Sequence, residues 1–68
     1  MARPVRAPDH VVQITRAAVE RRGVAPVARA LGLAQATVAR LAGGLPVAPG
    51  TALLAERRLP ALTGGDAA

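Results

Sequence analysis

The chain has 68 residues and contains no cysteine, Phe, Trp or Tyr. It therefore cannot form disulfides, and its small core must consist of aliphatic side chains. All nine basic residues are arginine, and with four acidic residues they give a net charge of +5, which favours a polyanionic partner. No apolar run approaches the roughly 20 residues of a membrane span, and the N-terminal sequence lacks a secretory signal, so we expect one cytoplasmic domain.

Residues 1–8 read MARPVRAP and alternate arginine and proline with small apolar residues. Because proline disfavours helix at its own position and at the one before it, this pattern predicts an extended, flexible basic arm. Arg3 and Arg6 in this arm are candidates for contact with a DNA backbone, including the walls of the minor groove. The alternative is a disordered tail whose charges only increase nonspecific attraction.

The first helix is predicted over about residues 10–22, with Asp9 as its N-cap and Gly23 as its stop. Apolar residues recur at helical spacing along one side, which indicates a half-buried helix; they are Val11, Val12, Ile14, Ala18 and Val19. On the polar side, Arg16 and Glu20 lie four residues apart and predict a surface ion pair of about 0.3 kcal/mol. Arg16 is also a candidate for contact with a DNA phosphate.

Two short helices follow, over about residues 25–31 and 35–42. Pro26 fits the first turn of the earlier helix, and Gly32 can adopt the left-handed conformation that ends it. The pair Gly43-Gly44 ends the later helix. The two helices share an apolar stripe that consists of Val27, Ala28, Leu31, Leu33, Val38 and Leu41.

A fourth helix is predicted from Pro49 to about Leu59, with Arg57 and Arg58 in its last turn, where cations are favoured. Residues 60–68 are predicted to be a flexible tail. The predicted fold class is therefore all-α, a compact bundle of four to five short helices, with the domain proper at residues 9–59.

Two short helices joined through a glycine-containing turn form the helix-turn-helix, whose second helix enters the DNA major groove. This motif needs a small residue at the helix crossing, a residue that tolerates positive φ at the turn, and buried anchors. Ala28 and Gly32 meet the first two needs. The anchors are Leu33, Val38 and Leu41 together with their neighbours in the apolar stripe.

The stretch VAPVARALGLAQATVARLAGG, followed by PVAPGTALLAERRL, resembles the phage-repressor and Cro-like (lambda-repressor-like) helix-turn-helix DNA-binding family over about residues 9–59. The family pattern of Ala, Gly four residues later and a β-branched residue six beyond matches Ala28, Gly32 and Val38. The resemblance implies a nucleoid-associated regulator of phage or mobile-element type that binds a near-palindromic operator in double-stranded DNA as a homodimer.

The chain departs from this family at two positions. Members often begin the first helix of the motif with a glutamine that binds a phosphate, where this chain has Ala25-Pro26, and often cap the second with Ser or Thr, where it has Ala34. We therefore expect backbone N–H groups and arginines to hold the phosphates.

The candidates for reading bases lie on the helix at residues 35–42 and are Gln35, Ala36, Thr37 and Arg40. Arg40 can bind guanine O6 and N7 with its fork, a contact worth about 1–3 kcal/mol of discrimination, and Gln35 suits adenine or a phosphate. Arg29 is a candidate for a phosphate contact that positions the protein without reading sequence. The alternative for each is an ordinary exposed helix surface.

Catalysis is not expected, because the chain has no Cys or Ser nucleophile, a single His10 and scattered acidic residues. The same residues predict no metal site, no cofactor and no small-molecule ligand. Gly43-Gly44 is not followed by the Gly-Lys-Ser/Thr of a phosphate loop.

A homodimer is expected through the fourth helix and the segment Leu59-Pro60-Ala61-Leu62, and the expected function is repression or autoregulation by occupying an operator. The alternative is a small helical protein-interaction module, an antitoxin or adaptor, without direct DNA readout. Arg16, Arg29 and Arg40 on one face with the start of the 35–42 helix would favour DNA binding. An exposed leucine patch without arginine would favour the adaptor.

Overall fold

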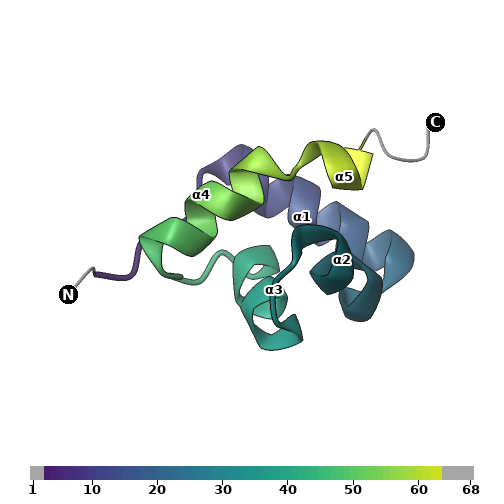
Figure 1. Ribbon diagram of the computed structural model, residues 1–68, viewed down its shortest axis with the longest axis horizontal. Coiled ribbons are helices and arrows are strands. Elements are labelled where there is room, and N and C mark those ends of the chain that lie inside the picture. Colours follow the sequence, from purple (N-terminus) through teal and green to yellow (C-terminus); the bar gives the residue numbers. More distant parts are fainter. Residues whose placement is uncertain (1–2, 64–68) are drawn as a thin grey trace.

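The computed structural model describes residues 3–63, which form helices connected by short loops (Figure 1). The helices are α1 (Asp9–Arg22), α2 (Val24–Leu31), α3 (Gln35–Ala42), α4 (Pro49–Arg57) and α5 (Pro60–Thr63). The prediction of an all-α fold with four to five short helices is therefore confirmed. Residues 1–2 of the predicted arm and 64–68 of the predicted tail lie outside the described residues.

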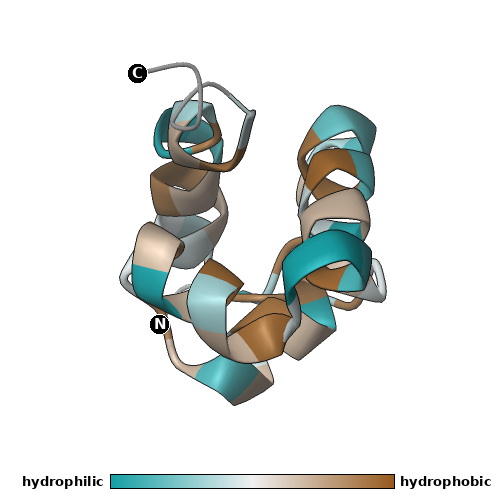
Figure 2. Ribbon diagram, turned by 90° about the vertical axis from the view of Figure 1, so that its right-hand side faces the viewer, coloured by the Kyte–Doolittle hydropathy of each residue, from teal (hydrophilic) through white to brown (hydrophobic). Residues whose placement is uncertain are grey.

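The helix α1 organises the packing, since α2, α3 and α5 all lie against it and α2 also contacts α3 and α5. In Figure 1, α1 runs lengthwise, with α2 and α3 drawn below it and α5 above its far end. Figure 2 shows hydrophobic and hydrophilic segments in turn along the helical ribbons, as expected for helices buried on one side.

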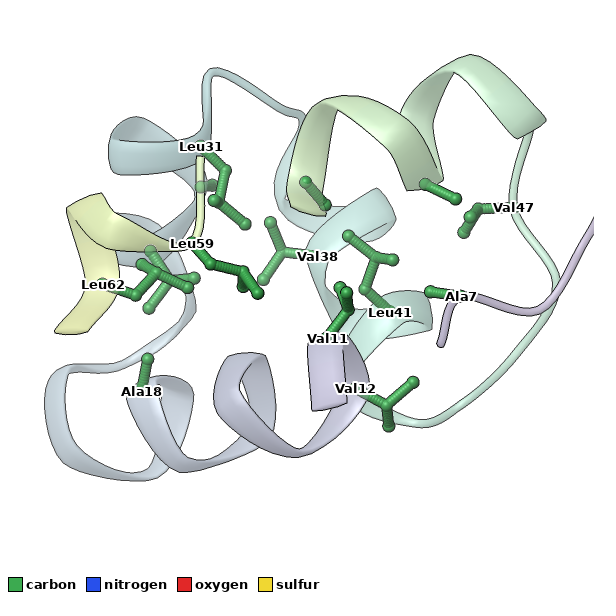
Figure 3. Packing of buried hydrophobic residues seen from close by; sticks show 14 residues of the cluster. Ala7, Val11, Val12, Ala18, Leu31, Val38, Leu41, Val47, Leu59 and Leu62 are labelled. Atoms are coloured by element: carbon green, nitrogen blue, oxygen red, sulfur yellow. The ribbon is translucent and has the colours of Figure 1, made fainter. Parts of the chain in front are cut away.

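The core is built from alanine, valine and leucine alone, in agreement with the composition (Figure 3). Leu31, Leu59 and Leu62 lie together in it, although they come from α2, the α4–α5 connection and α5. Its fourteen buried hydrophobic residues are Ala7, Val11, Val12, Ala18, Val27, Ala28, Leu31, Val38, Leu41, Val47, Ala52, Ala55, Leu59 and Leu62.

The start of α1 differs from the prediction. Asp9 is the first helical residue, its side chain makes no capping hydrogen bond, and Pro8 occupies the N-cap position. The N–H groups of Val11 and Val12 donate to the carbonyl oxygen of Pro8 at 2.9 and 3.1 Å. Asp9 still stabilises this end through its charge, because carboxylates are favoured in the first turn of a helix.

The prediction of a flexible C-terminal tail is wrong for residues 60–63. Pro60 starts α5, as proline can at a first helical position, and Leu62 is completely buried. The Nη2 atoms of Arg21 and Arg22 donate to the carbonyl oxygen of Leu62 at 3.5 and 3.3 Å. The domain therefore extends past residue 59, because the core needs a leucine that the helical periodicity of α4 could not reveal.

The prediction of a flexible arm is also wrong for residues 5–7, which pack against the rest of the chain. Val5 forms an isolated antiparallel bridge with Val47, and the two backbone N–H···O bonds measure 2.7 and 2.8 Å. Ala7, two residues further on, is 4% exposed. Segment 5–7 is extended, as predicted, but it is fixed against the loop between α3 and α4.

Thr15 is the one buried polar residue among the described core positions, on the face of α1 that also carries Val11 and Ala18. Its Oγ1 has no hydrogen-bond partner within the described part of the chain. A buried hydroxyl without a partner costs about 1–3 kcal/mol, so Thr15 makes α1 less stable in its site than valine would.

Replacement of Leu62 by alanine tests whether α5 belongs to the core. We expect Leu62→Ala to lower the free energy of unfolding by about 2–5 kcal/mol, because it leaves a cavity in a core with few large side chains. The control is Leu45→Ala, at a position that is 51% exposed, and we expect it to change the free energy of unfolding by about 0.5 kcal/mol or less. Chemical denaturation followed by circular dichroism measures both, and equal effects would contradict the assignment of α5 to the core.

Candidate nucleic-acid interface

The connection between α2 and α3 is a three-residue turn at 32–34 in which Gly32 is left-handed, with φ +69° and ψ +33°. Two backbone hydrogen bonds close this end of α2, from Gly32 N–H to the Arg29 oxygen at 3.3 Å and from Leu33 N–H to the Ala28 oxygen at 3.0 Å. This pair of bonds is the Schellman arrangement, in which glycine is the favoured residue. The predicted role of Gly32 as the end of the helix is confirmed.

Arg58 holds the same turn from outside, and sequence reasoning missed this role. Its Nη1 donates to the carbonyl oxygen of Leu31 at 3.1 Å, the last carbonyl of α2. A Cβ atom at Gly32 would collide with this Nη1. Arg58 and Leu31 are 27 residues apart in the sequence, so no local pattern could indicate this contact. The sequence showed only an arginine at the end of a predicted helix, where a cation is favoured.

The inner face of α3 is fixed by Val38 and Leu41, both completely buried, while Leu33 packs partly buried against the core. Ala28 on α2 is 5% exposed. The burial predicted for Ala28, Val38 and Leu41 is confirmed. These residues hold α3 so that its remaining side chains point away from the core.

The outer face of α3 carries the residues predicted to read bases. Gln35, Ala36 and Arg40 are exposed and Thr37 is partly exposed. Ala34 precedes the helix in extended conformation without a side-chain cap, and the first hydrogen bond of α3 runs from Val38 N–H to the Ala34 oxygen, at 3.0 Å. The N–H groups of the first turn thus have no partner within the helix, as expected of a helix N-terminus.

Three of the predicted DNA-contacting arginines gather at the other end of α3, around residues 42–46. Nε of Arg16 donates to the Ala42 oxygen at 2.9 Å, and Nε of Arg40 donates to the Pro46 oxygen at 3.3 Å. Arg6 lies over Gly44, where a Cβ atom would be 3.5 Å from its Nη2. We refer to Arg6, Arg16 and Arg40 as the arginine cluster.

The predicted ion pair between Arg16 and Glu20 is wrong, because Arg16 turns toward α3 instead. Among the described residues, Arg6 forms an ion pair with Asp9 at 3.7 Å, and Nε2 of His10 lies 3.5 Å from Oε2 of Glu56. A carbonyl at the negative end of α3 is a better partner for Arg16 than an exposed carboxylate one turn away, since helix C-termini attract cations.

The other predicted phosphate contacts stand apart from this cluster. Arg29 is exposed in the last turn of α2 and donates no side-chain hydrogen bond to another described residue. Arg3 is exposed two residues before the bridged Val5. The structure therefore brings Arg16 and Arg40 together at the C-terminal end of α3, with Arg6 in place of Arg29, while Gln35 and Thr37 lie at the N-terminal end.

No pocket and no group of three His, Asp or Glu residues occurs within residues 3–63. None of the helices in this range is long and apolar enough to cross a membrane. In comparisons with known proteins, no family model, no curated protein and no solved structure matches this chain.

Two glycine substitutions test the turn. We expect Gly32→Ala to lower the free energy of unfolding by at least about 1 kcal/mol, because alanine is strained in the left-handed region and would displace Arg58 from Leu31. Gly50→Ala is the matched control: Gly50 lies in α4 with open space around it, so alanine should stabilise by about 0.4–1 kcal/mol. Chemical denaturation measures the change in the free energy of unfolding for both variants. Changes of opposite sign support the constraint at Gly32, and changes of the same sign would contradict it.

Proposed function

We propose that this chain is a sequence-specific double-stranded DNA-binding protein in which α2 and α3 form a helix-turn-helix and α3 lies in the major groove. The observation that carries the proposal is the exposed outer face of α3, held rigidly by buried anchors and flanked by the arginine cluster. In this assignment Gln35, Ala36, Thr37 and Arg40 face base edges, and Arg3, Arg6, Arg16 and Arg29 face phosphates.

The dimensions of α3 support this assignment. An α-helix with its side chains is about 10–12 Å across, which fits the roughly 12 Å width of the major groove, and the eight residues of α3 extend about 12 Å along its axis. From Gln35 to Arg40 the rise is about 7.5 Å, or roughly two base-pair steps. One α3 can thus read a few adjacent base pairs, which is a partial site.

A homodimer would bring two copies of α3 to successive major grooves about 34 Å apart, and we propose that it represses or autoregulates by occupying an operator. The expected dimer contact needs correction, since Leu59 and Leu62 are buried in the chain's own core. Leu53 on α4 is 57% exposed, so we assign the contact between copies to α4 around this residue.

The alternative, a helical interaction module without DNA readout, draws on the exposed Leu45 and Leu53, which are 51% and 57% exposed. Leu45, however, directly follows Gly44, over which Arg6 lies, so its surroundings are not free of arginine. Isolated exposed leucines are ordinary on protein surfaces. The charge around α3 therefore favours DNA as the partner.

Selection of bound duplexes from random DNA, followed by gel shifts at several salt concentrations, tests the proposal. Arg40→Ala should cost roughly tenfold in affinity for the selected sequence and relax the preference at one base pair. Arg29→Ala should weaken all sequences alike and reduce the slope of log K against log salt by about 0.9.

Arg57→Ala is the matched control, because Arg57 is exposed on α4 and its loss changes the net charge equally. It should leave the sequence preference unchanged. If no duplex is enriched, or if Arg57→Ala matches Arg40→Ala in every measurement, the proposed readout is wrong and the interaction module is the better account.

A further inference from the structure

We infer that segment 5–7 is a fixed part of the DNA-contacting surface, in which the pairing of Val5 with Val47 holds Arg6 beside Arg16, and these two arginines bind backbone phosphates next to Arg40 and α3. The inference rests on the proposed DNA binding and specifies one of its contacts. It replaces the expected flexible arm.

The position of the segment is set by backbone bonds that need no DNA. Val5 N–H donates to the Val47 oxygen at 2.7 Å, and Val47 N–H donates back at 2.8 Å. The residues on either side of Arg6 in this arrangement are held in place: Val5 is bonded to Val47, which is 6% exposed, and Ala7 is 4% exposed. Arg6, between the bridged and the buried residue, has little freedom to move away.

Arg6 and Arg16 present their guanidinium groups in a form suited to phosphate. Arg16 bonds the Ala42 oxygen through Nε, so its paired Nη groups, which can fork onto a phosphate, are not used in this bond. Arg6 lies with Nη2 and Nε over Gly44, where a Cβ atom would be 3.5 and 3.6 Å away, in ordinary van der Waals contact.

The nearest competing anion is Asp9, whose Oδ1 lies 3.7 Å from Nη2 of Arg6. Both side chains are more than half exposed, so this pair is weak and a phosphate can replace it.

The substitution Val5→Pro tests the inference, because proline removes the N–H donor of the bridge and leaves every charge in place. We expect it to weaken binding to a selected duplex about as much as Arg6→Ala, roughly tenfold, and both variants to lower the salt slope by about 0.9. Val5→Thr keeps the N–H and is the matched control, with binding equal to that of the unmodified chain. Circular dichroism checks that each variant is helical.

Hydrogen exchange on the unmodified chain adds a readout that does not depend on DNA or on a variant. The Val5 and Val47 amides should be protected before DNA is added, and rapid exchange of both would overturn the fixed segment. Unchanged affinity of Val5→Pro, while the unmodified chain binds its selected duplex, would overturn the inference and leave DNA binding intact. Failure of the unmodified chain to bind any duplex would instead overturn the proposed function.

Discussion

The left-handed turn at Gly32 is the constraint on which the rest of the structure depends. It ends α2, and its closing bonds to Ala28 and Arg29 set where α3 begins. Arg58 covers the turn from the end of α4 and binds the last carbonyl of α2, so elements far apart in sequence fix one bend. Within α3, Val38 and Leu41 are buried in the core. This burial fixes the orientation of the helix, and its polar side faces outward.

Arginine supplies the polar contacts that hold the ends of these short helices together. Arg16 binds the last carbonyl of α3, Arg58 that of α2, and Arg21 and Arg22 meet at a carbonyl in α5. Helix C-termini leave carbonyls without partners and carry partial negative charge, so a cation there satisfies both. The high arginine content therefore serves the fold as well as the proposed contact with DNA. Composition alone does not distinguish these two roles of arginine.

Local patterns in the sequence were sufficient to predict the first four helices and the buried stripe, but not α5. Glycine, proline and helical periodicity placed the first three helices within about a residue of their ends, and α3 at its observed bounds, because these signals act within a few residues. Most of the errors concern long-range contacts: Leu62 in the core, Val5 against Val47, and Arg58 over Gly32. The N-cap expected at Asp9 is a local error, since Pro8 takes that position. For the site, exposure of Gln35 and Arg40 followed from periodicity, whereas the grouping of Arg6 with Arg16 needed the tertiary fold.

In the proposed function, the turn at Gly32 presents the outer face of α3, together with residues 42–47, as the surface that binds DNA. Titration of isotope-labelled protein with a selected duplex, followed by amide NMR shifts, maps this surface residue by residue. We expect the largest changes at Gln35 to Arg40 and at residues 42–47, with small changes in α5. Largest changes on α4 and α5, with α3 unaffected, would contradict it.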